Sequence, residues 1–177
     1  MKKRLGTIGL SVVLSLFVAA CVSPGAKAPK TASGKGISMY VLINRGITRS
    51  MTNNQVKNRN QVGKWMERDL PALLKKAGYK PRLITRRSQY KSSGNAYLLV
   101  VKITSYNPGA KAARMFVGYG AGATSMKTHY ELYGKGRRRI LADDLGVGSG
   151  RDWRNVIRKI DTLTVRAVSQ KLNQRTR

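Results

Sequence analysis

The chain has 177 residues and a formal net charge of +28, from 35 Lys and Arg residues against 7 Asp and Glu residues. This length suffices for one domain of ordinary size and excludes a second one. The only cysteine, Cys21, excludes an intramolecular disulfide, so packing alone must stabilise the fold. The large positive charge favours acidic partners.

Residues 1–21 have the layout of a secretory signal. Three basic residues follow Met1, an uncharged apolar run extends from Leu5 to Phe17, and Val18-Ala19-Ala20 stands directly before Cys21. The apolar run is shorter than the about 20 residues that a bilayer-spanning helix needs. We therefore expect the leader to be cleaved. An ordinary signal peptide with an incidental cysteine is the alternative.

The run Val18-Ala19-Ala20-Cys21 resembles the lipobox of bacterial lipoproteins, which reads apolar, small, small, cysteine. The resemblance implies that residues 1–20 are removed, that Cys21 receives a diacylglyceryl group on its sulfur, and that the new amino terminus is acylated, so that palmitate is incorporated. Several acyl chains hold a protein on a bilayer where a single chain does not. Val22, standing where an Asp would retain the protein, implies an outer-membrane protein facing the periplasm.

Residues 21–36 form a lipidated, flexible tether in this interpretation, because Val22–Gly36 is rich in Gly, Pro, Ala, Ser and Lys and has no apolar period. Without the leader the chain keeps 32 basic and 7 acidic residues, a net charge of +25. We expect residues 37–177 to be a single basic domain. Its expected partners are anionic lipid, lipopolysaccharide, acidic polysaccharide or an acidic protein. A basic surface without a specific ligand is the alternative.

The first long element of the domain is an amphipathic helix. From Asn54 to Ala77, apolar residues recur at three- and four-residue steps. Asn53 or Asn54 is expected to cap its start and Gly78 its end. Pro71 removes a backbone donor, so we expect a kink or a break near position 69. Strands are expected around this helix at Ile37–Asn44, Lys80–Arg87 and Ala96–Tyr106.

The second half predicts a long strand at Arg114–Tyr133, turned back by Gly134-Lys135-Gly136 into a strand at Arg137–Ala142. A helix is expected at Asp152–Leu172, with Ser149 and Asp152 forming its capping box. The order of elements predicts an α+β fold, a mixed and mainly antiparallel sheet of about five strands with two amphipathic helices packed on one face.

Three glycines, Gly118, Gly120 and Gly122, share one face of the expected long strand, the face that continues with apolar residues. They are expected in the interior, where another backbone approaches closely. In the alternative, this face meets another copy, and the protein is a structural subunit of an oligomeric envelope export or assembly complex. The Gly-x-Gly-x-Gly spacing does not match a nucleotide-binding loop, so no cofactor is expected.

The same region contains Asn107-Pro108-Gly109, Arg114, Val117-Gly118-Tyr119-Gly120-Ala121-Gly122 and Gly134-Lys135-Gly136. With these motifs the chain resembles an uncharacterised family of bacterial envelope lipoproteins over about Ala96–Leu172. The resemblance implies a periplasmic α/β domain of unknown activity. This chain departs from the family in having Tyr119 in place of Phe, and Tyr133-Gly134 where an acidic residue often precedes the turn. The order of elements is also similar to that of small lipoproteins that assist polysaccharide or curli export, some of which form rings.

Catalytic chemistry is poorly represented, and we expect no enzyme. His129, the only histidine, is predicted on the solvent side of its strand beside Lys127 and Glu131, which leaves no triad. Asp143-Asp144 is expected to end a strand and to neutralise nearby arginines. Two carboxylates alone are a weak metal site, so no metal is expected.

Two groups of basic residues are the candidate anion-binding surfaces, because the arginine fork suits phosphate and carboxylate. Nucleic acid would contact such groups through phosphates without base readout, and is not an expected partner. Charged edges that prevent aggregation are the alternative for either group. The expected function is that of a non-enzymatic, membrane-anchored envelope lipoprotein. The first group is Arg82, Arg86, Arg87 and Lys91, and the second is Lys135, Arg137, Arg138 and Arg139.

Overall fold

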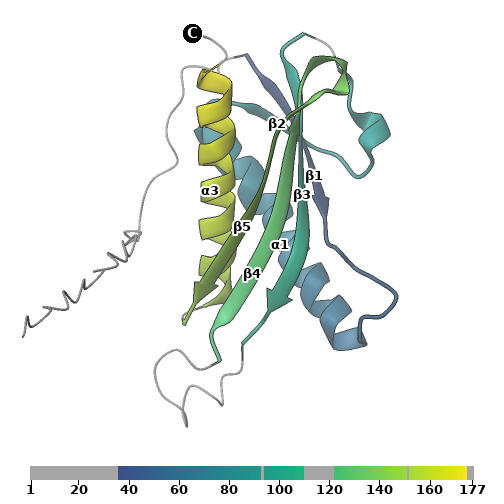
Figure 1. Ribbon diagram of the computed structural model, residues 1–177, viewed down its shortest axis with the longest axis vertical. Helices are drawn as coiled ribbons and strands as arrows, with labels where there is room; N and C mark the ends of the chain where they lie inside the picture. Colours follow the sequence, from purple (N-terminus) through teal and green to yellow (C-terminus); the bar gives the residue numbers. More distant parts are fainter. Residues whose placement is uncertain (1–35, 93, 110–121, 151, 175–177) are drawn as a thin grey trace, which may run out of the picture.

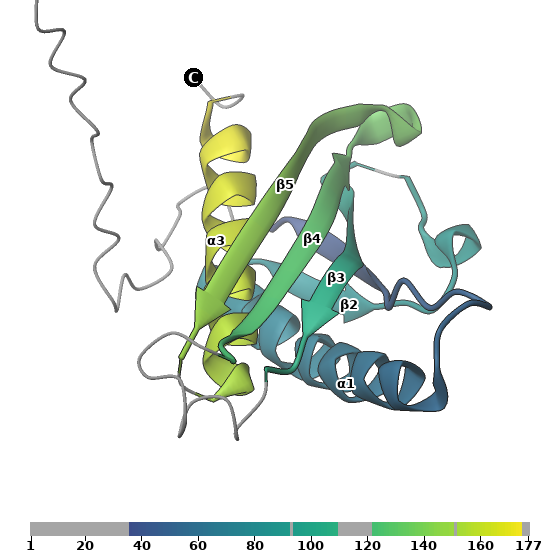
Figure 2. The same cartoon turned by 60° about the horizontal axis from the view of Figure 1, so that its bottom comes forward.

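The computed structural model describes residues 36–92, 94–109, 122–150 and 152–174. A five-stranded sheet in the order β2-β1-β3-β4-β5 has two helices on one face (Figures 1 and 2). β1 runs parallel to β2 and β3, whereas β3–β4 and β4–β5 are antiparallel. The predicted α+β class is confirmed. The elements are β1 (Ser38–Asn44), α1 (Asn53–Lys76), β2 (Lys80–Leu83), β3 (Ala96–Asn107), β4 (Thr124–Tyr133), β5 (Arg139–Ser149) and α3 (Trp153–Asn173), with short 3-10 helices η2 (Arg87–Gln89) and η3 (Lys135–Arg137).

Helix α1 begins with a capping box at Thr52. The Gln55 N–H donates to the Thr52 hydroxyl (3.3 Å), and the Thr52 N–H donates to the Gln55 side-chain oxygen (2.9 Å). The prediction of an Asn53 or Asn54 cap is therefore wrong, because a hydroxyl with Gln three residues later satisfies two free donors reciprocally.

Pro71 lies inside α1, and the helix continues through it to Lys76, so the predicted break is wrong. The proline removes one donor, but Leu70 and Leu74 on either side are fully buried. Packing of the apolar face therefore outweighs the lost bond. The helix ends as expected before Gly78, whose φ is +95°.

The main core lies between the helices and the inner face of the sheet. The even-numbered face of β4 was predicted to be mostly apolar, and its five residues from Thr124 to Leu132 are all buried. Helix residues such as Met66 of α1 and Ile157 of α3 pack against them. Buried strand residues of this core include Met39, Val41, Leu99, Val101, Ile103, Met126, Tyr130 and Leu132.

The second half of the sheet differs from prediction at its ends. β2 stops at Leu83, and β5 continues to Ser149, so the predicted strand end at Ala142 is wrong. Asp143 and Asp144 lie within β5 because antiparallel pairing with β4 continues through them and outweighs their low strand propensity. The cap of α3 is Asp152 itself, which accepts a bond from the Arg154 N–H (2.8 Å), and not Ser149.

The expected glycine strand is described only from Gly122 onward, and Arg114–Ala121, with Gly118 and Gly120, lies outside the described residues. β4 begins only at Thr124, and Gly122 has a φ of +68°. Gly122 is therefore not in an extended strand, and the prediction for this residue is wrong. Its carbonyl closely approaches Gly109, where an added Cβ would lie 2.2 Å from the Gly122 oxygen. A side chain at position 109 is therefore excluded by the lack of space and disfavoured by the φ of +74°.

Candidate anion-binding surface

The face of the sheet away from the helices carries the candidate site. The segment from Ile84 to Ser92 folds over this face and buries a second apolar cluster that includes Tyr90 and Leu98. The Tyr90 hydroxyl lies 3.1 Å from the Gly134 carbonyl oxygen. The Gly136 N–H donates to the Ser92 hydroxyl (2.9 Å). These contacts tie the η2 segment to the turn between β4 and β5.

Glu131 joins the two predicted basic groups. Its carboxylate accepts a hydrogen bond from the Arg87 guanidinium (3.2 Å) and one from the Arg139 guanidinium (3.0 Å). Arg87 also donates to the Tyr133 hydroxyl (2.9 Å) and stacks over its ring at 4.7 Å from the centroid. Arg87 of η2 thus meets residues of β4 that are 44 and 46 positions away in the sequence.

The ionised state of Glu131 is favoured by these neighbours. Burial alone would raise its pKa, but hydrogen bonds with Arg139 and Tyr133 and the charges of Arg87 and His129 outweigh burial and lower the pKa of Glu131. The carboxylate therefore remains charged and holds two arginines in place.

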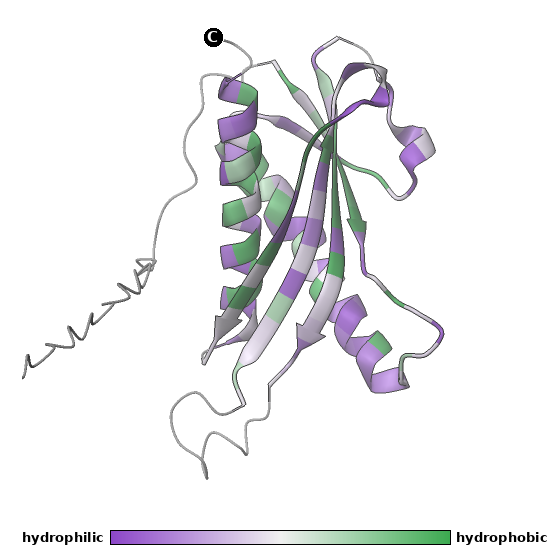
Figure 3. Ribbon diagram, viewed as in Figure 1, coloured by the Kyte–Doolittle hydropathy of each residue, from purple (hydrophilic) through white to green (hydrophobic). Residues whose placement is uncertain are grey.

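We use the name "basic surface" for seven exposed cations in or beside η2 and the turn between β4 and β5, two of which contact the Glu131 carboxylate. Figure 3 shows the hydrophilic colouring of η2 and of the turn between β4 and β5 that carry them. Arg82 of β2 lies on the same face of the sheet, because it is in register with Tyr40 of β1. The Tyr40 ring packs edge-on against Tyr90 on that face. The basic surface consists of Arg86, Arg87, Lys91, Lys135, Arg137, Arg138 and Arg139.

His129 is a cross-strand surface residue, as predicted. Its Nδ1 lies 3.1 Å from an Asp144 carboxylate oxygen, and the Asp144 side chain is 78% exposed. Within the described part of the chain, no hydroxyl is hydrogen-bonded to His129, and no three His, Cys, Asp or Glu side chains gather as a metal site requires.

Other expected site residues divide into those the structure describes and those it does not. Cys21, Gly118 and Gly120 lie outside the described residues. Among the helices that the structure describes, none is both long and apolar enough to cross a membrane. Tyr133 was expected beside the second basic group, whereas Glu131 was not expected to join the two groups. The signal for Glu131 was its position two residues before Tyr133, on the solvent face of a strand that ends at a basic turn.

Comparison with known proteins finds one matching family. A family model described as "Domain of unknown function (DUF4410)" matches residues 28–152. No curated protein matches the chain.

Solved structures similar to this chain include protein XCC0632 from Xanthomonas campestris, of family DUF330, at 10% identity and a TM-score of 0.49, covering 82% of this chain and 92% of that one. A PelC dodecamer from Paraburkholderia phytofirmans has 12% identity and a TM-score of 0.43, with coverages of 82% and 92%. A putative neuraminyllactose-binding hemagglutinin homolog from Helicobacter pylori has 11% identity and a TM-score of 0.36, with coverages of 85% and 88%.

Proposed function

This chain belongs to the family described as "Domain of unknown function (DUF4410)", and we propose its function from its own residues. It is a non-enzymatic, membrane-anchored envelope lipoprotein whose basic domain binds anionic envelope material or an acidic partner. The observation that carries the proposal is the junction at Glu131. Through it, the two basic groups meet in one exposed surface with the Glu131 carboxylate between them.

The position of this surface supports a membrane-proximal role. The Ser38 N–H, at the start of β1, donates to the Asn95 carbonyl (3.0 Å), and Asn95 adjoins the segment that carries Arg87 and Lys91. β1 therefore starts at the end of the sheet that carries the basic surface (Figure 1). A lipid on Cys21 would hold this end against the headgroups of the outer membrane on its periplasmic side.

Electrostatics would supply the binding energy. A basic residue near an anionic membrane contributes about 1 kcal/mol, and salt screens this attraction over a Debye length of about 8 Å at physiological ionic strength. The partner class is therefore anionic lipid, lipopolysaccharide, acidic polysaccharide or an acidic protein, all of which present dense negative charge to exposed arginines and lysines.

The test measures binding to vesicles that contain phosphatidylglycerol, using the chain from residue 21 with Cys21→Ser so that no lipid anchor contributes. Four cations of the basic surface, Lys91, Lys135, Arg137 and Arg138, are changed to Gln. We expect at least a tenfold loss of affinity at low salt, because about 1 kcal/mol is removed at each position.

A charge-matched control changes four exposed lysines of the helical layer to Gln, namely Lys57, Lys64, Lys75 and Lys159. This control should bind within about threefold of the unchanged protein, because salt screens charges that lie more than a Debye length from the vesicle. Equal losses in both variants would mean that net charge alone drives binding, and would overturn the assignment of the surface.

A further inference from the structure

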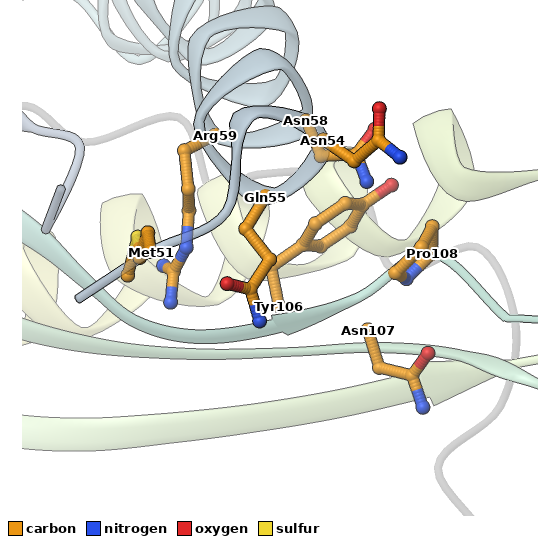
Figure 4. A pocket seen from close by; sticks show the side chains of 8 residues that line it. All are labelled: Met51, Asn54, Gln55, Asn58, Arg59, Tyr106, Asn107 and Pro108. Carbon is orange, nitrogen blue, oxygen red and sulfur yellow. The ribbon is translucent and has the colours of Figure 1, made fainter.

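A second site lies at the opposite end of the sheet from the basic surface. A pocket of about 350 Å³ opens between the first turns of α1 and the last residues of β3 (Figure 4). Side-chain amides, a tyrosine ring and a buried guanidinium line most of it. It shares no residue with the basic surface.

Arg59 supplies a buried positive charge at one side of this pocket. The residue is 6% exposed. Its guanidinium donates to the carbonyl oxygens of Ile103 (3.0 Å) and Thr104 (3.2 Å), at the bulge where the β3–β4 register shifts. These bonds use two of its five N–H donors.

No carboxylate balances this charge among the residues that the structure describes, because none of their ion pairs includes Arg59. Burial lowers the pKa of Arg59, which expresses the cost of an uncompensated cation in a poorly solvated place. An anion that enters the pocket would supply the missing counter-charge at the donors that remain.

Neutral hydrogen-bonding groups line the rest of the pocket. Figure 4 shows the amides of Asn54 and Asn58 beside the hydroxyl end of the Tyr106 ring, while Arg59 lies on the other side of Gln55. Within the described residues, the side chains of Asn54, Asn58 and Tyr106 have no hydrogen-bond partner. Each amide offers both donors and an acceptor. Burial and the charge of Asp152 raise the pKa of Tyr106, so its hydroxyl keeps its proton.

We infer that this pocket binds an acidic sugar residue, with its carboxylate at Arg59 and its hydroxyls at Asn54, Asn58 and Tyr106. Sugar hydroxyls donate and accept, as the amides do, whereas a phosphate ion mainly accepts. The volume lies at the small end of ligand pockets. The charge of Asp152 acts at Tyr106 and disfavours a carboxylate at that side of the pocket. The inference goes beyond the proposed function, because it concerns a different site and a different mode of recognition.

The test uses the full chain in detergent micelles and isothermal titration calorimetry with D-galacturonate. D-galactose presents similar hydroxyls without the carboxylate, and inorganic phosphate presents charge without the ring. We expect saturable binding of galacturonate and at least tenfold weaker binding of both controls. Galactose cannot form the charge-assisted bond with Arg59, and phosphate has no ring hydroxyls to bind the amides. Absent saturation with galacturonate, or equal affinity for either control, overturns the inference.

A comparison of the affinities for trigalacturonate and for the monomer distinguishes the two sources of the sugar. Tighter binding of the trimer than of the monomer indicates a chain of acidic polysaccharide, and equal or weaker binding indicates a free or terminal residue. Either result supports the site, provided that the monomer competes for it.

Variants locate the binding. Asn54→Ala with Asn58→Ala removes two amides from exposed or half-buried positions, and should weaken galacturonate binding about tenfold or more. Gln61→Ala, on the same helix but outside the pocket, is the matched control and should leave the affinity unchanged. Arg59→Lys keeps the charge and loses the fork, with about tenfold weaker binding expected. If Arg59→Lys does not fold, the asparagine pair decides, and unchanged binding by that pair overturns the site.

Discussion

Glu131 shows how one carboxylate can organise a surface made of repelling cations. It accepts hydrogen bonds from Arg87 and Arg139, whose side chains are 54% and 60% exposed, while its own is 17% exposed. Because the arginines remain largely in water, these ion pairs add little to stability. Their main effect is on geometry, since they fix the direction of two guanidinium groups.

Replacing Glu131 with Gln tests this role. The lowered pKa of Glu131 means that its contribution to the free energy of unfolding is full above the unfolded-state pKa and is lost as the pH falls through the folded-state pKa. We expect Glu131→Gln to lower the free energy of unfolding by about 1 kcal/mol or less at neutral pH. The free energy of unfolding of the variant should also fall less steeply as the pH is lowered, and urea titrations measure both effects. The affinity for anionic vesicles should not fall, because the variant lacks the Glu131 carboxylate, which the vesicles repel. Weaker binding would show that arginine geometry, rather than charge, governs recognition.

Asp161 is a second residue whose environment sets its chemistry. It lies fully buried on α3, and three oxygens of Asp161 and Asp69 have no hydrogen-bond donor while both groups are ionised. Burial, then the charge of Asp69 and a hydrogen bond with it, raise the pKa of Asp161 well above its ordinary value, against the opposing charge of Arg158. A proton on Asp161 supplies the donor that the pair lacks.

Asp161→Asn should stabilise the fold at neutral pH. A raised folded-state pKa gives a contribution that is full below the ordinary value of 3.8 and is lost as the pH rises through the folded-state pKa. The neutral amide can donate to Asp69 at any pH. We expect the stability difference, variant minus unchanged protein, to grow by up to about 1.4 kcal/mol per pH unit within that interval. Urea titrations from pH 4 to 7 measure it, and a constant difference would contradict the shared-proton arrangement.

At the scale of elements, the cap of α1 is Thr52, whereas Asn53 or Asn54 was expected from the sequence. Thr52→Ala removes the hydroxyl that accepts the Gln55 N–H and should lower the free energy of unfolding by about 1 kcal/mol. Asn53→Ala, at the cap expected from sequence, is the matched control, and should stay within about 0.5 kcal/mol. Equal effects, or a larger effect at Asn53, would contradict the capping box.

Elements with strong periodicity were predictable, and their ends were not. The apolar steps of α1 and the β-branched run of β3 are properties of the segments themselves. The extension of β5 through Asp143 and Asp144 depends on its partner β4, which no local pattern reveals. Continuation through Pro71 likewise depends on packing between helix and sheet.

The candidate site was predictable to a similar degree. Clusters of Arg and Lys are visible in the sequence, but their union requires the β4 register that sets Glu131 between Arg87 and Arg139. The pocket at Arg59 had no sequence signal, because the buried arginine occupies an ordinary position in an amphipathic helix. Its significance comes from the bulge of β3, which presents two carbonyls to one guanidinium.

The whole molecule has two ends with different chemistry. The basic surface lies at the end where β1 starts, and the Arg59 pocket lies at the other end (Figures 1 and 2). If the lipid on Cys21 holds the first end at the membrane, the second end faces away from the membrane and is open to soluble ligands. The proposed binding of headgroups and of acidic sugar would then be compatible in one molecule.

Lipid anchor and basic surface should respond differently to salt. Burial of acyl chains does not depend on ionic strength, whereas the attraction of the basic surface is screened within about 3 Å at 1 M salt. Cells grown with labelled palmitate should label the unchanged protein and not Cys21→Ser. On phosphatidylglycerol vesicles, the lipidated protein should remain bound at 1 M salt, whereas the Cys21→Ser chain without its leader should dissociate. Release of both forms would leave the basic surface as the whole attachment, and retention of both would show that contacts other than charge hold the domain on lipid.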